Sequence, residues 1–274
     1  MRLISVLFAS SAPGVAYNAL LNQFTGHFTN FAQCSSSSSS SSSSSEHVLA
    51  SSHEWIQVSL SPAFKVDGKD SKLAIYSFES DPEKIFRTRL YTFEPAAETD
   101  ASNAASNAAV VAEMEIWNLP KDLQTELEEN YKLNINGPNL PPPPPEILPS
   151  LLPSCTLIPG CKVTWSSVPS PDRRFEYFPK GCEGFHGTLP EGGVTIESQY
   201  STLGLPIIVH DEISVSPSRI YINDRGTDLE GNVIYGRGVW DGKGPYLMDR
   251  VADGNYERDR DRLLQGATIQ ARKK

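Results

Sequence analysis

The sequence contains no run of about 18 or more apolar residues, the length that a helix needs to cross a bilayer, and we therefore expect no membrane span. Positive charge is scarce as well. Lys and Arg number 24 against 33 Asp and Glu, and the net charge of −9 argues against nucleic acid or an anionic membrane as the main partner. No phosphate-binding loop and no dinucleotide fingerprint occurs. With 39% of 274 residues hydrophobic, the chain can form one large domain or two small ones.

Cysteine is also rare. The chain has four, too few for a disulfide-rich scaffold, and this usage suits a reducing compartment. One combination of side chains could be considered as a metal set: Cys155, Cys161, Cys182 and His186. Its spacing, C-x5-C-x20-C-x3-H, lacks the closely paired cysteines of a zinc knuckle, so we predict no metal site. Two alternatives stay open for Cys161 and Cys182, a disulfide between them or two free buried thiols.

Three stretches of low complexity interrupt the chain, at residues 35–45, 96–109 and 134–149. The first is an unbroken serine tract, which cannot bury apolar surface and should form a disordered loop. The second is rich in Ala and Asn and looks like an inserted loop. The third contains five consecutive prolines, which predict a polyproline II spacer on the surface.

These stretches suggest a simple domain organisation. Residues 1–16 are either a targeting segment or an ordinary N-terminal lead into the first helix. Residues 251–274 form a charged tail, expected to be a solvated helix or a frayed end. We expect a single folded domain over residues 17–250, with the three low-complexity stretches as loops on it.

Hydrophobic periodicity predicts an N-terminal helix followed by many short strands. Apolar residues recur on one helical face over residues 17–33, which would leave Asn30 and Gln33 facing water. A second, short helix is expected over residues 121–131. Alternation predicts strands over residues 55–60, 72–78, 86–93, 110–117, 161–166, 174–178, 193–200, 205–210, 213–215, 219–223 and 232–235. Ten or eleven short strands with Gly and Pro turns favour an all-β barrel or sandwich.

One strand carries a pattern of interest for function. Four side chains share one face of the strand over residues 86–93: Arg87, Arg89, Tyr91 and Phe93. If that face lines a cavity, the two guanidiniums need anions, and a dicarboxylate ligand would satisfy both. Spacing alone favours the alternative, in which both arginines face solvent while Phe86 and Leu90 face the core.

A turn over residues 224–232 lies between two expected strands. Asp224 and Asp228 can accept hydrogen bonds from nearby backbone N–H groups and hold the turn. Gly226 is expected to supply a positive φ. Arg225 is expected to pair with Asp228. From the residues alone, Asp224 is therefore a turn-capping carboxylate.

A run of three polar residues, His210, Asp211 and Glu212, stands at the end of an expected strand. It suggests acid–base chemistry only superficially, because no serine in a nucleophile elbow accompanies it. We interpret the run as a polar cluster at a strand end.

Five segments of the chain, in order, resemble the CpcT/CpeT family of phycobilin lyases. They are residues 21–33, residues 75–91, the two cysteine positions in Pro159-Gly160-Cys161 and Gly181-Cys182, Asp224-Arg225-Gly226, and Gly244-Pro245-Tyr246. No single motif is unique to the family, but five in the right order are fairly specific. The resemblance covers most of the chain, from about residue 20 to residue 246.

The resemblance implies an antiparallel, lipocalin-like β-barrel with an N-terminal helix and a pocket for an open-chain tetrapyrrole, phycocyanobilin or phycoerythrobilin, in a protein that is commonly a dimer. By this resemblance Arg87 and Arg89 would hold the two propionates of the pigment. Asp224 would accept hydrogen bonds from the pyrrole N–H groups and favour the protonated bilin. Tyr76 and Tyr91 would line the pocket.

The activity implied is that of a chromophore lyase, which joins the bilin to a cysteine of a phycobiliprotein β subunit through a thioether. The attacking thiolate belongs to the acceptor, while the lyase supplies orientation, electrostatics and shelter, here through Arg87, Arg89 and Asp224. The expected location is a plastid, with the cytoplasm as the alternative. A different function on the same barrel is a non-catalytic protein that binds bilins or lipophiles, or serves as a scaffold in plastid biogenesis.

Overall fold

A computed structural model of the protein describes residues 13–30, 32–33, 55–78, 81–97, 109–133, 140–168, 184–201, 203–236 and 245–251. The serine tract, the strand expected over residues 174–178 and the charged tail lie outside these residues. Most of the Ala/Asn-rich insert and the first part of the proline-rich stretch lie outside them as well.

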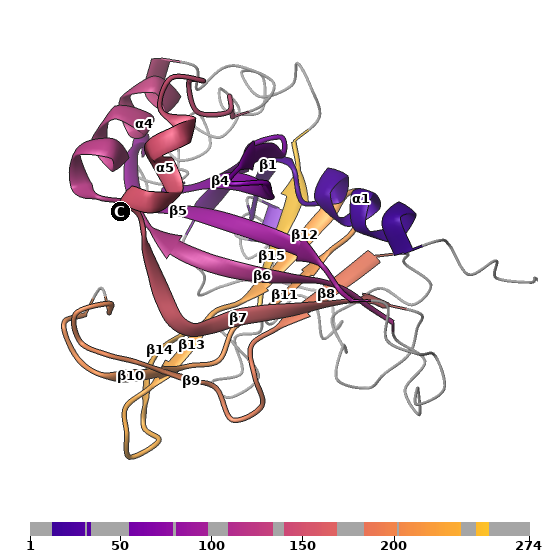
Figure 1. Ribbon diagram of the computed structural model, residues 1–274. Helices are drawn as coiled ribbons and strands as arrows, with labels where there is room; N and C mark the ends of the chain where they lie inside the picture. Colours follow the sequence, from indigo (N-terminus) through magenta and orange to yellow (C-terminus); the bar gives the residue numbers. More distant parts are fainter. Residues whose placement is uncertain are drawn as a thin grey trace, which may run out of the picture.

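The main element is an antiparallel sheet of eleven strands, ten of which close into a barrel through the pairing of β2 with β4 (Figure 1). The barrel strands are β1 (Gly26–Thr29), β2 (Ile56–Leu60), β4 (Lys69–Phe78), β5 (Asp81–Pro95), β6 (Val110–Asn118), β7 (Thr156–Val168), β8 (Gly184–Thr188), β11 (Glu212–Val215), β12 (Arg219–Asn223) and β15 (Tyr246–Arg250). Strand β3 (Phe64–Val66) pairs with β4 beside the ring. The expected all-β antiparallel barrel is confirmed.

Four shorter strands form a second antiparallel sheet, in the order β14-β13-β10-β9. They are β9 (Val194–Ile196), β10 (Ile207–Val209), β13 (Arg225–Thr227) and β14 (Val233–Gly236). The chain leaves the barrel after β8 to form β9 and β10, returns for β11 and β12, and leaves again for β13 and β14. In Figure 1 this small sheet, in orange, lies below the barrel.

Three helices complete the described part of the chain: α1 (Pro13–Gln23), α4 (Lys121–Leu133) and α5 (Leu148–Ser154). None of the helices among the described residues has the length and apolar character needed to span a membrane. Helix α4 agrees with the helix expected over residues 121–131. Helix α5 begins inside the expected proline-rich spacer, where Leu140 is also buried, so the end of that stretch is packed rather than a free surface spacer.

A hydrophobic cluster lies outside the barrel, where α4 and α5 cover β4 and β5 (Figure 1). Leu73 and Ile75 of β4 and Leu90 of β5 pack there against Leu127 of α4 and Leu151 of α5. Burying each such side chain contributes about 1.5–3 kcal/mol to stability. The outer face of β5 is therefore occupied, and the arginines on its other face must point into the barrel.

The barrel interior is apolar toward one end. Phe24, the residue directly after α1, packs there against Phe93 of β5 and Trp165 of β7, with ring centroids 6.1 and 5.3 Å away. All three side chains are buried. Further along the inner face of β5, Arg89 and Arg87 replace the aromatic rings. The apolar plug at one end and the arginines beyond it define where a polar site can form.

The expected helix over residues 17–33 is wrong in its second half, because the helix ends at Gln23 and residues 26–29 form β1. Gly26 has a φ of 112°, which a helix cannot accommodate and which glycine adopts without strain. Asn30 and Gln33 are buried rather than facing water. The amide of Asn30 accepts a hydrogen bond from the backbone N–H of Ile56, and the amide of Gln33 binds the backbone next to β15.

The expected turn over residues 224–232 is also wrong at its start, because Arg225–Thr227 form β13 and the chain turns only after them. The strand expected over residues 193–200 shortens to β9. Strands β1, β3, β8, β13 and β15 were not expected, and each has only three to five residues. Such short strands give too few alternations for a periodic signal.

Candidate ligand-binding site

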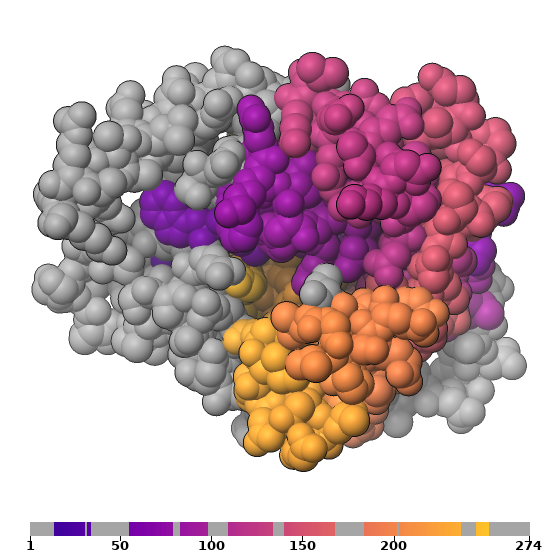
Figure 2. All heavy atoms as spheres, turned by 90° about the vertical axis from the view of Figure 1, so that its left-hand side faces the viewer, coloured from indigo at the N-terminus to yellow at the C-terminus, as the bar shows by residue number. Residues whose placement is uncertain are grey.

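A cavity of about 560 Å³ lies between the barrel and the small sheet. Figure 2 shows a hollow between the purple surface of β5 and the orange and yellow surface of the small sheet. Most of its wall is apolar, with side chains from both sheets: Ile56, Ile116, Ile158, Val163, Ile196, Ile207, Val209, Ile213, Ile222, Val233 and Ile234. Volumes of roughly 300–1,000 Å³ with apolar walls are typical of small-molecule sites.

All five residues that the sequence and the resemblance single out line this cavity: Arg87, Arg89, Tyr76, Tyr91 and Asp224. The arginines and tyrosines come from neighbouring strands of the barrel, with Tyr76 of β4 opposite Arg87 of β5. The solvent-facing alternative for Arg87 and Arg89 is therefore wrong. Their roles toward a ligand remain predictions.

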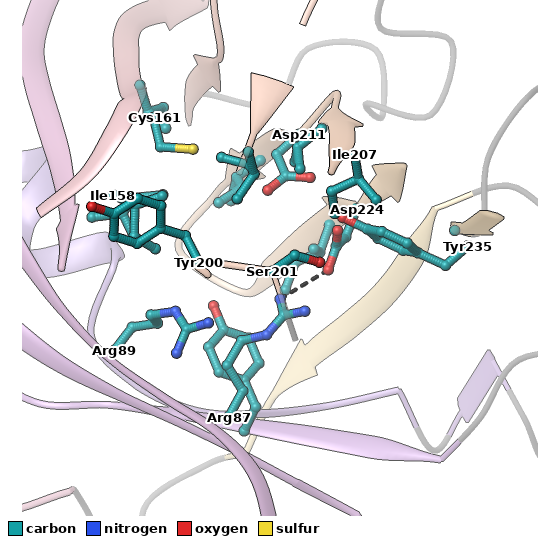
Figure 3. A pocket seen from close by; sticks show the side chains of 18 of the residues that line it. Arg87, Arg89, Ile158, Cys161, Tyr200, Ser201, Ile207, Asp211, Asp224 and Tyr235 are labelled. Carbon is teal, nitrogen blue, oxygen red and sulfur yellow. Dashed lines mark hydrogen bonds and ion pairs between the residues drawn. The ribbon is translucent and has the colours of Figure 1, made fainter. Parts of the chain in front are cut away.

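Arg87 is engaged within the protein. Its Nη1 lies 2.9 Å from Oδ2 of Asp224, which follows β12 (Figure 3). The guanidinium also lies 5.7 Å from the ring centroid of Tyr76. The charge of Asp224 outweighs burial and raises the pKa of Arg87. Burial alone would raise the pKa of Asp224. The charge of Arg87 and its hydrogen bond oppose this effect and bring the pKa below its usual value, so this carboxylate is ionised.

Asp211 is the polar residue of the cavity that the sequence reading missed. It was interpreted as part of a strand-end cluster, but it lines the cavity beside Asp224 (Figure 3). Burial, and then the charge of Asp224, raise the pKa of Asp211 well above its usual range, which favours the protonated form of this carboxyl. A signal was available: Asp211 continues the alternation of Ile207, Val209 and Ile213, which all line the cavity.

Arg89 has no ion-pair partner among the described residues. Its Nη1 donates to the backbone oxygen of Thr88 at 2.9 Å. Burial, and then the charge of Arg87, lower its pKa. Among the described residues that line the cavity, two guanidiniums thus face the ionised Asp224 and Asp211, whose raised pKa favours the neutral acid, so positive charge predominates. An anionic group on a ligand would balance it.

Tyrosines supply neutral hydroxyls to the same space. The hydroxyls of Tyr76 and Tyr91 lie 2.8 Å apart, and burial raises the pKa of both. Tyr235 of β14, which the sequence did not single out, also lines the cavity, and burial and then the charge of Asp224 raise the pKa of its hydroxyl. Its ring lies directly over Gly226, where an added Cβ would stand 2.1 Å from the ring carbon Cε1.

Gly226 therefore serves close packing and not a positive φ, which corrects the expectation from the sequence. The other turn residues also differ in part. Asp228 does cap the turn, since its Oδ1 accepts hydrogen bonds from the backbone N–H groups of Glu230 and Asn232. Asp224 does not cap it. Arg225 pairs with Glu212, with 3.6 Å between Nη2 and Oε1, and not with Asp228.

Cys155 and Cys161 carry free thiols, and Cys182 lies outside the described residues. Cys161 lines the cavity, where burial and then the charge of Asp211 raise the pKa of its thiol to about 12. No group of three or more His, Cys, Asp or Glu side chains in the described ranges is placed to hold a metal ion. His186 instead has its Nδ1 2.7 Å from the hydroxyl of Ser214.

Comparison with known proteins gives a structural match. No protein-family model matches the chain, and no curated protein matches it by sequence. Among solved structures, the selenomethionine form of the CRL protein of Arabidopsis is similar, with a TM-score of 0.57 and 18% sequence identity. The similarity covers 88% of this chain and 100% of the other. The two proteins share a fold.

Proposed function

We propose that this protein binds an open-chain tetrapyrrole in the cavity and presents it to a cysteine of a phycobiliprotein β subunit, in the manner of the CpcT/CpeT lyases. The observation that carries the proposal is Arg89, a partly buried cation that makes no ion pair with the described residues, beside the ion pair of Arg87 and Asp224 in a cavity with mostly apolar walls. The ordered motifs that resemble the lyase family support it. The fold shared with the CRL protein of Arabidopsis is consistent with it.

The chemistry of the cavity suits such a pigment. A bilin has a long conjugated body, which fits walls of Ile and Val. It has two propionates. Arg89, which makes no ion pair with the described residues, would bind one of them, and Arg87 would be a second hydrogen-bond donor. Its pyrrole N–H groups need an acceptor, and the ionised Asp224 is one. These residues would fix the pigment in one orientation, which is the main contribution a carrier can make to a reaction whose nucleophile comes from the acceptor.

Cys161 bears on how the pigment would leave. A thiol in the cavity could itself add to an electrophilic bilin, and this would trap the pigment. Because the pKa of Cys161 is raised to about 12, almost none of it is thiolate at neutral pH, and a protonated thiol is a poor nucleophile. The pigment would therefore stay noncovalently bound until an external thiolate reaches it.

The test is a titration of the purified full-length chain with phycocyanobilin, followed by incubation with an apo-β subunit. We expect a saturable change in the visible spectrum and then pigment that stays on the β subunit after denaturation. Binding without transfer would instead support the non-catalytic carrier or scaffold. No binding at all would remove the pocket assignment.

The ion pair should matter for that binding. In Arg87→Ala the carboxylate of Asp224 loses its partner, and in Asp224→Asn the pyrrole N–H groups lose an ionised acceptor. Hydrogen bonds to charged groups are worth about 1.5–3 kcal/mol, so each variant should raise the Kd for phycocyanobilin by roughly 10- to 100-fold, measured by absorption titration. Unchanged binding in both variants would contradict the assignment.

A further inference from the structure

Asp211 and Asp224 stand opposite one another where two strands leave the barrel. Glu212 of β11 pairs with Asn223 of β12, so the next residue on each strand, Asp211 and Asp224, extends the same register. Their side chains point into the same part of the cavity (Figure 3), and each carboxyl group shifts the pKa of the other.

Two neighbouring carboxyl groups that are largely shielded from water cannot both be ionised without a large electrostatic cost, so such a pair favours a state with one proton. The surroundings decide which residue carries it. Arg87 contacts Oδ2 of Asp224 at 2.9 Å, and its charge lowers the pKa of that carboxyl, which places the negative charge there. Oδ1 of Asp211 is buried and receives no hydrogen bond from the described residues. An oxygen in that position is the natural site for the proton.

We propose that Asp211 and Asp224 form a carboxyl pair that shares one proton, and that Asp211 passes this proton to a ring nitrogen of a tetrapyrrole bound in the cavity. The O–H bond of Asp211 breaks, an N–H bond of the pigment forms, and no electrons are exchanged. The pigment becomes a cation between two carboxylates, which stabilise it. This inference rests on the proposed function and adds the source of the proton.

The inference narrows the class of ligand. A fatty acid could pair its carboxylate with Arg89 but has no basic atom to receive the proton of Asp211. A ligand that uses the whole cavity has an anionic group for Arg89, an apolar body and a basic nitrogen near the carboxyl pair. A linear tetrapyrrole with an imine nitrogen has all three.

Several titratable groups face Asp211 from the elements packed around it, and each bears on its proton: Arg87, Tyr76, Cys161, Tyr235 and Asp224. Tyr76, Cys161 and Tyr235 also have raised pKa values, so their side chains stay neutral up to alkaline pH. The two permanent charges, Arg87 and Asp224, pair with each other. Between about pH 6 and about pH 8 the proton on Asp211 is thus the one that can move within this group.

The first test needs no pigment. Infrared spectra of the wild-type protein at neutral pH should contain the carbonyl band of a protonated carboxylic acid, which Asp211→Asn should abolish. The Asn amide can still donate to Asp224, so this variant should fold. Glu212→Gln, one residue away and outside the pair, is the matched control and should retain the band. A wild-type spectrum without the band would overturn the shared proton.

The second test measures the Kd for phycocyanobilin from about pH 6 to about pH 8. In wild type the proton comes from within the protein, so the Kd should stay nearly constant. In Asp211→Asn the proton must come from solvent, so the Kd should rise about tenfold for each unit by which the pH increases. Glu212→Gln should behave as wild type.

The two tests separate the inference from the proposed function. Equal pH profiles for wild type and Asp211→Asn would overturn the transfer of the proton to the pigment. Absence of any pigment binding to the wild type would contradict the proposed function, and with it the transfer. The infrared band would then still decide whether Asp211 and Asp224 share a proton.

Discussion

Lys72 is a fully buried amine on the inner side of β4, at the plugged end of the barrel. Its Nζ donates to the hydroxyl of Thr25 and, at 3.0 Å, to the backbone oxygen of Ser61, and it makes no ion pair with the described residues. Burial, and then the charge of Arg250, lower its pKa to about 7, although Asp70 opposes this. A lysine in this state costs stability whenever it is charged.

This gives a prediction with a definite sign. The folded pKa of Lys72, about 7, lies below the ordinary value of 10.5. Below pH 7 the buried amine is charged in the folded protein, and the full cost of burying that charge lowers stability. This cost is relieved as the pH rises toward 10.5. The free energy of unfolding of wild type should rise relative to Lys72→Met by at most about 1.4 kcal/mol per pH unit in that window. Urea unfolding at several pH values measures it, with Lys121→Met at the exposed first residue of α4 as the control for loss of charge. A difference that does not change with pH would contradict the account.

Gly226 offers a second prediction at the scale of one residue. Because a Cβ there would overlap the ring of Tyr235, Gly226→Ala should push Tyr235 away from Asp224. Overpacking of this kind costs about 1–3 kcal/mol. We expect a lower urea midpoint and weaker binding of phycocyanobilin. Tyr235→Phe, which removes the hydroxyl and keeps the ring, should weaken binding with a smaller loss of stability. A Gly226→Ala protein with wild-type stability and binding would show that the ring is free to move.

At this scale the sequence predicts the site in part. The alternation along residues 86–93 places Arg87 and Arg89 on one face, and the family resemblance adds Tyr76, Tyr91 and Asp224. Alternation alone cannot say which face is the interior, because that depends on α4 and α5, which lie far away in the sequence and cover the other face. Tyr235 had no signal, since its contact with Asp224 requires β14 to fold back over Gly226.

Among the elements, length decided what could be predicted. The long strands β4, β5, β6 and β7 have nine or more residues each, and alternation in the sequence predicted at least part of every one. Strand β1 was read as helix, because its four residues follow α1 directly and Phe28 fits the helical spacing of the residues before it. Only the pairing of β1 with β2 and β15 makes it a strand.

Strand β8 supplies a test of close packing between elements. A Cβ at Gly187 would meet Cγ1 of Val163 at 2.8 Å and the ring of Trp165 at 2.9 Å, both on β7. Gly187→Ala should therefore lower the free energy of unfolding by about 1–3 kcal/mol. Gly14→Ala in α1 is the control, because nothing lies within 4 Å of its Cβ and Ala favours a helix by up to about 1 kcal/mol. Urea unfolding of both variants decides the matter, and equal stabilities would contradict the packing.

For the molecule as a whole, the cavity arises from the way the chain leaves the barrel twice. The small sheet, built from the two excursions, covers the end of the barrel opposite the plug formed by Phe24. Charged groups from β5 and from the strand ends after β10 and β12 thereby meet in an enclosure with aliphatic walls. Sequence patterns predict the strands but not this second sheet, because its partners are separated by the whole of β11 and β12.

The central claim is that Arg89, which makes no ion pair with the described residues, holds an anionic group of an open-chain tetrapyrrole. Its most direct test is the Kd for phycocyanobilin in wild type, Arg89→Ala and Arg219→Ala, the last removing an arginine that pairs with Asp249 away from the cavity. From the roughly 1.5–3 kcal/mol of a charged hydrogen bond, Arg89→Ala should bind about 10- to 100-fold more weakly, and Arg219→Ala should match wild type. Equal affinities for all three proteins would contradict the claim.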